Sequence, residues 1–304
     1  MSLLGSALTL VALGAAALPA YREIRRKSIK DLRAAAPGEL ADLSQGRTHF
    51  QWHGPQDAPV VVCIHGLTTP SFVWEGLTPH LINSGVQVLS YDLYGRGYSD
   101  APRGLQSPAF FTRQLSDLLD HEGIDVPVTL IGYSMGGAIA TSFAAANPDR
   151  THRLILIAPA GMGHDLGPLA RFTVDVPILG DWAFHMGYPN QFRSGIASER
   201  ALPSSVDNIG DRQAAQLDRR GFVRSVLSSL RGQLRTPLEE DHRRIAATGL
   251  PVTAIWARDD KVIPIRAMGT LAQWSRNARQ EVIAGAGHGL PYTHTADLAR
   301  ALTA

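Results

Sequence analysis

Cysteine is nearly absent from this chain of 304 residues, which contains only Cys63. A single cysteine excludes a disulfide within the chain and any cysteine-based zinc cluster. Aromatic residues are also few, at 7%, but hydrophobic residues make up 44% of the sequence and exclude a disordered chain. The length fits one or two domains and can build a core without a disulfide or metal.

An excess of charge of one sign is also missing, because 29 basic and 27 acidic residues leave a formal net charge of +2. This balance gives no reason to expect nucleic acid as a partner. The charge is unevenly distributed, since residues 1–33 contain six basic and two acidic side chains, a net charge of +4. The remaining 23 basic and 25 acidic residues give the rest of the chain a net charge of −2. The basic character therefore belongs to the N-terminus.

Apolar, β-branched runs that alternate with helical patterns predict an α/β fold, with a mostly parallel sheet flanked by helices. An antiparallel edge strand or hairpin is predicted at residues 43–53. Residues 161–250 break the alternation, and a structureless loop of that length is improbable inside a compact domain. We therefore predict an inserted helical cap there, with helical segments such as 211–232. The strand-like runs are residues 60–65, 86–92, 128–133, 153–160, 251–257 and 280–285.

The strongest chemical signal is Gly-Tyr-Ser-Met-Gly-Gly at residues 132–137, between a predicted strand and a predicted helix. In this context a G-x-S-x-G sequence is typical of a nucleophile elbow. The sharp turn places Ser134 in strained backbone angles, so small residues must flank it on both sides. The hydroxyl is then held at a helix N-terminus, where the dipole favours developing negative charge. A phosphate-binding turn is the alternative, but the G-x-G-x-x-G spacing and the P-loop lysine are missing.

A serine nucleophile needs a base, which is itself oriented by a carboxylate. Asp259 and Asp260 follow the predicted strand at residues 251–257, and His288 lies among glycines after the last predicted strand. The chain order of serine, aspartate and histidine is that of the nucleophile-elbow enzymes. No cluster of histidines and acids suggests a metal site.

On these motifs the sequence resembles the α/β-hydrolase superfamily over roughly residues 45–304. The shared features are a His-Gly turn at residues 63–67, a D-x-x-G-x-G-x-S signature at 92–99, an Asp-x-hydrophobic-hydrophobic-Pro pattern at 260–264 and Gly-x-Gly-His at 285–288. The resemblance implies an α/β-hydrolase fold with a lid over the site, and no cofactor.

The resemblance also implies roles for single residues: Ser134 as nucleophile, His288 as base and Asp260 as acid. The backbone N–H groups of Leu67 and Met135 would form the oxyanion hole. Residues that flank the predicted site, or that lie in an apolar cluster of the cap, are candidates for a substrate pocket: Thr68, Phe72, Trp74, Tyr133, Trp182 and His185.

Two assignments have alternatives. Asp259 could replace Asp260 as the acid, but the spacing to Pro264 favours Asp260. His65 could be mistaken for the base, but its place in the His-Gly turn favours a structural role with hydrogen bonds to the backbone.

The favoured function is a serine hydrolase that cleaves carboxylic esters through an acyl-enzyme, as a carboxylesterase or a monoacylglycerol lipase does. Dehalogenases and epoxide hydrolases of this superfamily have aspartate at the elbow, where this chain has Ser134. Its carbon–carbon hydrolases usually have asparagine before the nucleophile and tryptophan after the histidine, where this chain has Tyr133 and Gly289. Carbon–carbon, thioester, lactone and amide hydrolysis stay as alternatives. A non-catalytic receptor is another, although it has no physical need for a general base.

Residues 2–20 carry no charge and are long enough to span a bilayer. The basic cluster that follows predicts a membrane anchor with the catalytic domain in the cytoplasm. A cleaved signal peptide of a secreted or periplasmic protein and a helix docked on the domain are the alternatives. The expected partners are this membrane and a small-molecule ester, with lipids among the candidates, while the oligomeric state is not predicted. The predicted parts are a hydrophobic anchor and basic linker at 1–36, a core at 37–160 and 251–304, and a cap at 161–250.

Overall fold

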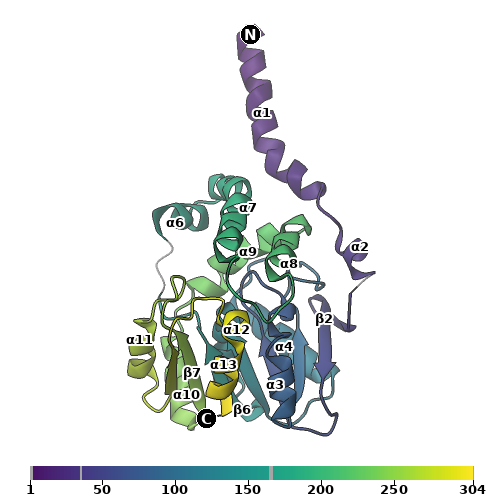
Figure 1. The fold of residues 1–304 in the computed structure, drawn as a ribbon. Coiled ribbons are helices and arrows are strands. Elements are labelled where there is room, and N and C mark those ends of the chain that lie inside the picture. The colour runs from purple at the N-terminus through teal and green to yellow at the C-terminus, as the bar shows by residue number, and fades with distance from the viewer. Residues whose placement is uncertain (1–2, 35, 164–166, 304) are drawn as a thin grey trace.

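A computed structural model describes residues 3–34, 36–163 and 167–303. In these residues eight strands form one sheet, in the order β1-β2-β4-β3-β5-β6-β7-β8 (Figure 1). Strand β2 is antiparallel to both of its neighbours, and the other neighbouring strands are parallel. The predicted α/β class with a mostly parallel sheet is confirmed. The strands are β1 Glu39–Leu43, β2 Gly46–His53, β3 Val60–Ile64, β4 Gln87–Tyr91, β5 Val128–Tyr133, β6 Thr151–Ile157, β7 Val252–Ala257 and β8 Arg279–Ile283.

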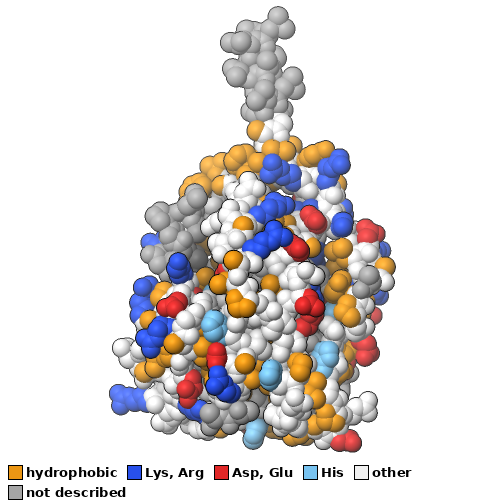
Figure 2. Space-filling model, in the orientation of Figure 1, with side chains coloured by type: hydrophobic (Ala, Val, Ile, Leu, Met, Phe, Trp, Pro, Cys, Tyr) orange, Lys and Arg blue, Asp and Glu red, His pale blue; other side chains and the backbone are white. Residues whose placement is uncertain are grey.

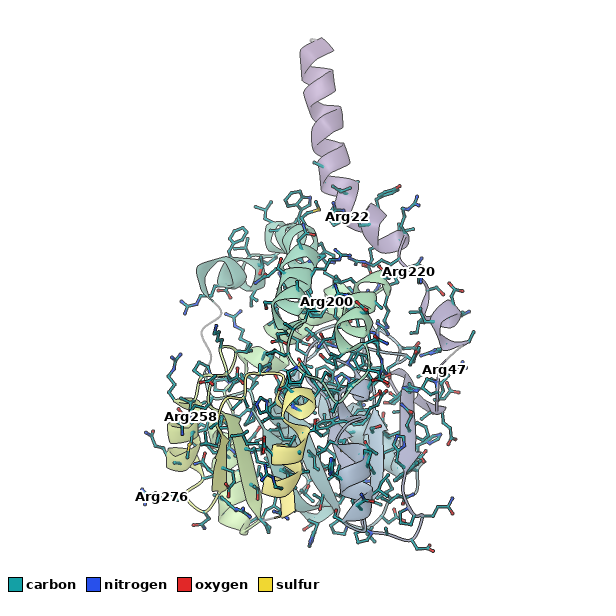
Figure 3. The ribbon with its side chains drawn as sticks, in the orientation of Figure 1. Arg22, Arg47, Arg200, Arg220, Arg258 and Arg276 are labelled. Carbon is teal, nitrogen blue, oxygen red and sulfur yellow. The ribbon has the colours of Figure 1, made fainter. Side chains whose placement is uncertain are left out.

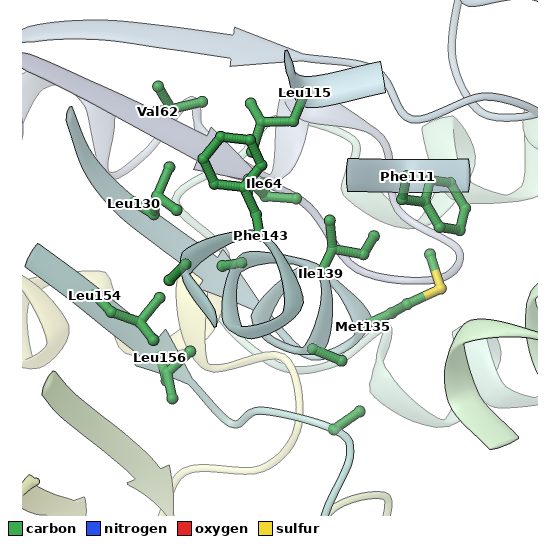
Figure 4. Close-up of a cluster of buried hydrophobic side chains, with 14 of the residues drawn as sticks. Val62, Ile64, Phe111, Leu115, Leu130, Met135, Ile139, Phe143, Leu154 and Leu156 are labelled. Atoms are coloured by element: carbon green, nitrogen blue, oxygen red, sulfur yellow. The ribbon is translucent and has the colours of Figure 1, made fainter. Parts of the chain in front are cut away.

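The sheet is buried on both faces, because successive side chains of a strand point to opposite sides. In β3, Val62 and Ile64 enter one hydrophobic cluster, while Val61 and Cys63 enter another. Figure 4 shows the first cluster, in which Met135, Ile139 and Phe143 of one helix pack against the strands. The first face is covered by α4 Pro108–His121, α5 Met135–Ala146, α10 Glu239–Thr248 and α11 Ala267–Trp274, and the second by the 3-10 turn η1 Ser71–Trp74 with α3 Thr78–Asn83, α12 Leu290–Thr293 and α13 Thr295–Thr303.

Most helices between β6 and β7 stand apart from the sheet. They have a hydrophobic cluster of their own around Phe222 and lie above the sheet in Figure 1. Helix α10 differs, because it packs against α5 and α11 and its Ile245 joins the first core cluster. We propose that the inserted unit ends before α10, and we name residues 167–231 the cap. Its helices are α6 Gly167–Asp175, α7 Leu179–Glu199, α8 Ile209–Ala215 and α9 Phe222–Arg231.

The predicted helical segment at 211–232 is interrupted in the structure. Helix α8 ends at Ala215, a 3-10 turn, η3, follows at Gln216–Asp218, and α9 begins at Phe222. Gly221 precedes α9 with φ of +92°, a left-handed conformation that a continuous helix does not contain. Helical periodicity alone could not locate this break.

The N-terminal segment, which we name the leader (residues 3–33), consists of α1 Leu3–Ile24 and α2 Ile29–Arg33. Among the residues that the structure describes, no helix is sufficiently long and apolar for a membrane crossing. The prediction of a membrane anchor at residues 2–20 with a cytoplasmic catalytic domain is therefore wrong, and residue 2 itself lies outside the described residues. Helix α1 contains Pro19 and ends in a charged turn.

The leader contacts the core through Arg33, which donates to Asp100 Oδ1 at 2.9 Å, and it contacts the cap at two places. In the cap, the indole N–H of Trp182 donates to the carbonyl of Ala15 at 2.8 Å. The N–H of Lys27 donates to the carbonyl of Asp218 at 2.8 Å, and the N–H of Arg220 donates to the carbonyl of Lys27 at 3.0 Å. Figure 3 shows Arg220 at this junction. The backbone of Lys27 therefore pairs with the cap in the break between α1 and α2.

Candidate active site

Ser134 lies in the turn between β5 and α5 and has φ of 54° and ψ of −119°. Non-glycine residues rarely adopt this conformation, so the surrounding structure must hold it. The N–H of Ser134 donates to the carbonyl of Ile157 at 2.9 Å, and the carbonyl of Ser134 accepts from the N–H of Ala160 at 3.0 Å. The strained turn is therefore fixed against the end of β6, as the elbow interpretation requires.

Two glycines make the elbow sterically possible. A Cβ on Gly136 would collide with the carbonyl oxygens of Ile64 and His65, which end β3 and begin the loop after it. A Cβ on Gly132 would collide with the backbone of Gly136. Helix α5 therefore starts in direct backbone contact with both neighbouring segments.

Ser134, His288 and Asp260 form one hydrogen-bonded chain, which we name the triad. The Ser134 Oγ lies 3.0 Å from His288 Nε2, and His288 Nδ1 lies 2.7 Å from Asp260 Oδ2. Because an ionised carboxylate only accepts, Nδ1 carries the proton and Nε2 accepts from the serine hydroxyl. This is the arrangement in which His288 can take the proton of Ser134.

The carboxylate of the triad is held by the turn that carries it. The N–H groups of Val262 and Ile263 donate to Asp260 Oδ1 at 2.7 and 2.8 Å, which leaves Oδ2 for His288. The Asp260 side chain is 1% exposed, whereas the neighbouring Asp259 is exposed. The structure thus brings Asp260 to the histidine, as the spacing to Pro264 predicts.

The two predicted oxyanion donors lie on either side of the elbow. Met135 is the first residue of α5, so its N–H has no partner carbonyl within the helix. Leu67 follows the His-Gly turn, where His65 Nδ1 lies 2.7 Å from the carbonyl of Gly66. His65 Nε2 accepts from the N–H of Leu93 at 2.9 Å, so Nδ1 must be the donor. His65 therefore orients the peptide that contains the Leu67 N–H.

The signature at residues 92–99 forms a buried polar turn. Asp92 accepts hydrogen bonds from the N–H groups of Ser71 and Tyr98, each at 2.9 Å, and lies 2.8 Å from His49 Nδ1. Burial raises the pKa of Asp92, but the hydrogen bond and charge of His49 outweigh that effect and lower the pKa to about 2. Asp92 is ionised at neutral pH and serves the architecture of the loop.

Arg96 links this turn to the loop of Leu67 and to the cap, a role that the sequence motif does not reveal. Its side chain is fully buried. Nε–H donates to the carbonyl of Leu67 at 2.9 Å, and one terminal nitrogen donates to Ser229 Oγ of α9 at 2.8 Å. The other terminal nitrogen donates to Gln106 Oε1 at 2.6 Å.

Leu67 also packs against both the first core cluster and the cap cluster. The predicted oxyanion loop therefore lies where core and cap meet.

The predicted pocket residues near the elbow differ in burial. Thr68 and Phe72 are half-buried, and the Arg212 guanidinium lies 4.2 Å from the centre of the Phe72 ring. Trp74 and Tyr133 are buried and pack edge to face, with ring centres 6.5 Å apart. The Tyr133 hydroxyl donates to the backbone carbonyl of His288 at 2.8 Å. Its position in this contact favours support of the triad over contact with a substrate.

The two predicted pocket residues of the cap, Trp182 and His185, form hydrogen bonds to groups outside the triad and its loops. Trp182 is 39% exposed and donates to Ala15 in α1, as described above. Figure 2 shows exposed apolar side chains at this end of the cap, where Ile178 and Leu179 lie beside Trp182 in sequence. His185 Nδ1 lies 2.8 Å from the carbonyl of Asp181 in its own helix.

Helix α7 instead presents a stack of three aromatic rings to the cap cluster. Phe184 and Tyr188 are 4.5 Å apart between ring centres, and Tyr188 and Phe192 are 5.7 Å apart. Phe192 also packs against Phe222 of α9 at 6.0 Å. The spacing of four residues places the three rings on one helix face, and none of them is among the predicted pocket residues.

Comparison with known proteins agrees with this geometry. Residues 61–301 match the profile described as the alpha/beta hydrolase family. Lipase LipV of Mycobacterium tuberculosis is 38% identical over 114 residues, which cover 37% of this chain and 41% of LipV. The 2-hydroxymuconate semialdehyde hydrolase of Pseudomonas putida is 27% identical over 220 residues, which cover 70% of this chain and 74% of that enzyme.

Solved structures share the fold. A thermophilic esterase from Thermogutta terrifontis aligns with a TM-score of 0.70 at 20% identity, covering 88% of this chain and 97% of the esterase. At this identity the likeness concerns the fold alone.

Proposed function

Because this chain belongs to the alpha/beta hydrolase family, we propose that it is a serine hydrolase that cleaves carboxylic esters through an acyl-enzyme. The observation that carries the proposal is the hydrogen-bonded chain from Ser134 through His288 to Asp260. In that chain the serine hydroxyl donates to a histidine whose other nitrogen is held by a carboxylate, which is the arrangement that activates a serine nucleophile.

The reaction follows from these contacts. His288 Nε2 takes the proton of Ser134 as Oγ bonds to the ester carbonyl carbon, and the carbonyl oxygen becomes an oxyanion. The N–H groups of Met135 and Leu67 donate to that oxyanion, and each such donor contributes about 3 kcal/mol in comparable sites. The imidazolium then protonates the leaving alcohol as its C–O bond breaks. Water, deprotonated by His288, attacks the acyl-enzyme and releases the carboxylic acid and free Ser134.

An ester with an apolar acyl chain is the favoured substrate class. Leu67, which carries one proposed oxyanion donor, packs against a cap cluster of aliphatic and aromatic side chains. The similarity to a lipase supports the same class. An acyl chain that leaves the oxyanion site toward the cap would be removed from water, at about 25 cal/mol per Å² of buried apolar surface.

Carbon–carbon hydrolysis is the second candidate, because a 2-hydroxymuconate semialdehyde hydrolase is among the relatives. The surroundings of the triad count against it. A Cβ on Gly289 would lie 2.6 Å from the Tyr292 hydroxyl, so the tryptophan usual after the histidine in those enzymes would require the Tyr292 ring to move. Tyr133 occupies the position of their asparagine and bonds to the His288 carbonyl.

A fluorophosphonate probe and an ester series test the proposal. We expect covalent labelling of the wild-type protein and none of Ser134→Ala, because the probe reacts with an activated serine. We also expect p-nitrophenyl decanoate to be cleaved with a higher kcat/KM than the acetate, and a monoacylglycerol to be cleaved as well. A folded protein that never labels would refute the serine hydrolase. Faster turnover of acetate, or of 2-hydroxymuconate semialdehyde, would refute the substrate class.

A further inference from the structure

The catalytic histidine lies in a loop with little stiffness of its own. Residues 285–289 are Gly-Ala-Gly-His-Gly, and glycine has more backbone freedom than any other residue. The N–H of Asp259 donates to the carbonyl of Ala286 at 2.9 Å, and the N–H of Leu290 donates to the carbonyl of Gly287 at 3.2 Å. These two bonds hold the ends of the loop. Besides the bond from its Nδ1 to Asp260, His288 has a further contact, which holds its backbone.

That contact comes from the residue next to the nucleophile. The Tyr133 hydroxyl donates to the His288 carbonyl at 2.8 Å, and the two rings lie 5.3 Å apart at 37°. Tyr133 ends β5 and is 5% exposed, with its ring edge-on to the buried Trp74. A Cβ on Gly66 would lie 3.3 Å from the Tyr133 ring, so the ring is also confined from that side. The Tyr133 hydroxyl therefore extends from a side chain that is held in place by its neighbours at the end of β5.

We propose that Tyr133 is a positioning residue that holds the base against the nucleophile, with its hydroxyl bonded to the backbone of His288. This inference rests on the proposed function. Tyr133 and Ser134 are adjacent in the chain, so the bond ties the nucleophile and the base to one strand end. The 3.0 Å contact between Ser134 Oγ and His288 Nε2 is then maintained although the histidine loop is rich in glycine. Burial raises the pKa of Tyr133 well above its usual value, so the hydroxyl stays a donor at working pH.

Tyr133→Phe tests the proposal, because it keeps the ring and removes the hydroxyl. Tyr292→Phe is the matched control, since the Tyr292 hydroxyl is also buried but donates to Glu199 at 3.0 Å. We expect Y133F to lower kcat for a p-nitrophenyl ester about 10- to 100-fold with KM nearly unchanged, because small misplacement of a catalytic group costs that much. The rate of fluorophosphonate labelling should fall in parallel, and Y292F should keep both rates within about threefold of wild type.

A second variant separates positioning from packing. A Cβ on Gly287 meets no atom within 4 Å, so Gly287→Ala can stiffen the histidine loop without a clash. We expect Y133F/G287A to recover at least about threefold of the kcat lost in Y133F, because less backbone freedom remains to be restrained. Urea unfolding of both variants separates this rescue from a general gain in stability, because positioning predicts recovery of kcat even where Y133F is fully folded in the assay.

Proton NMR provides a readout that does not require turnover. The His288 Nδ1–H bonded to Asp260 should give a low-field resonance that Y133F broadens and Y292F keeps. Wild-type kcat in Y133F, with this resonance intact, would overturn the proposal, as would losses of equal size in Y133F and Y292F. If the wild-type protein itself fails to label, the proposed function fails, and the resonance alone then decides the role of Tyr133.

Discussion

At the elbow, backbone segments approach each other closely because glycines carry only a hydrogen atom where other residues carry a side chain. Gly136 is the clearest case, because its missing Cβ leaves room for the carbonyls of Ile64 and His65. Those carbonyls belong to the segment that leads to Leu67. Any displacement of α5 therefore moves both proposed oxyanion donors.

Gly136→Ala should disturb this contact. We expect it to lower the free energy of unfolding by about 1–3 kcal/mol, as overpacking of a dense core does. Labelling of Ser134 should slow as well. Gly269→Ala in α11 is the control, because its added Cβ meets no atom within 4 Å and alanine favours the helix by about 1 kcal/mol. Urea unfolding and probe labelling measure both effects, and equal stability of the two variants would contradict the steric account.

At this scale the sequence singles out the three residues of the triad, because each of them stands in a local motif at a strand end. The structure brings Ser134, Asp260 and His288 together within hydrogen-bond distance. The bond from Tyr133 to His288 joins residues 155 positions apart and has no local signal. From the sequence alone, Tyr133 is therefore predicted only as a residue of the substrate pocket.

The connection between cap and core depends on a buried arginine. Arg96 donates to Leu67 in the proposed oxyanion loop and to Ser229 in α9. Burial lowers its pKa to about 9, which still leaves it charged at neutral pH. Arg96 therefore contributes directly to how α9 is placed relative to that loop.

Arg96→Met should loosen the cap, because methionine fills space but leaves the buried acceptors without donors. Each stranded acceptor costs about 1–3 kcal/mol, so we expect a loss of at least about 2 kcal/mol in the free energy of unfolding. We also expect lower kcat, since Leu67 loses its restraint. Arg258→Met, at an exposed position labelled in Figure 3, should change stability by less than about 0.5 kcal/mol. Similar unfolding curves for both variants would show that the Arg96 contacts contribute little.

The strands and helices are largely predictable from the sequence, since continuous apolar runs indicate buried strands. All six predicted parallel strands are present, and the predicted edge segment at 43–53 overlaps the hairpin of β1 and β2. The leader is the part of the chain for which the sequence gives the wrong prediction, a membrane anchor. Its composition resembles a membrane span, whereas its contacts with Trp182 and Asp218 depend on a cap surface formed some 160 to 190 residues later.

The stability of the whole molecule should depend on pH through its buried histidines. His242 is fully buried and stacks on Trp274, and among the residues that the structure describes neither of its ring nitrogens has a hydrogen-bond partner. Burial lowers its pKa from 6.5 to about 4. The unfolded chain therefore binds a proton below pH 6.5 that the folded protein does not. The stability present above pH 6.5 is lost as the pH falls toward 4, by up to roughly 3 kcal/mol.

His242→Phe should remove this part of the acid sensitivity, because phenylalanine keeps the ring and cannot be protonated. We expect the variant to be about as stable as the wild type at pH 7.5 and more stable at pH 5. Urea unfolding at the two pH values measures the difference. An unchanged loss between them would assign the acid sensitivity to other groups, such as His65, whose pKa burial also lowers to about 4.

The pairing of Lys27 with Asp218 and Arg220 sets an order for synthesis of the chain. The leader is made before its partner residues in the cap, which follow about 190 residues later. At 5–20 residues per second, the leader waits roughly 10 to 40 seconds before it can bind. The leader therefore reaches its final position only after the chain has been made through the cap, and by then the segment that carries Ser134 has already been synthesised.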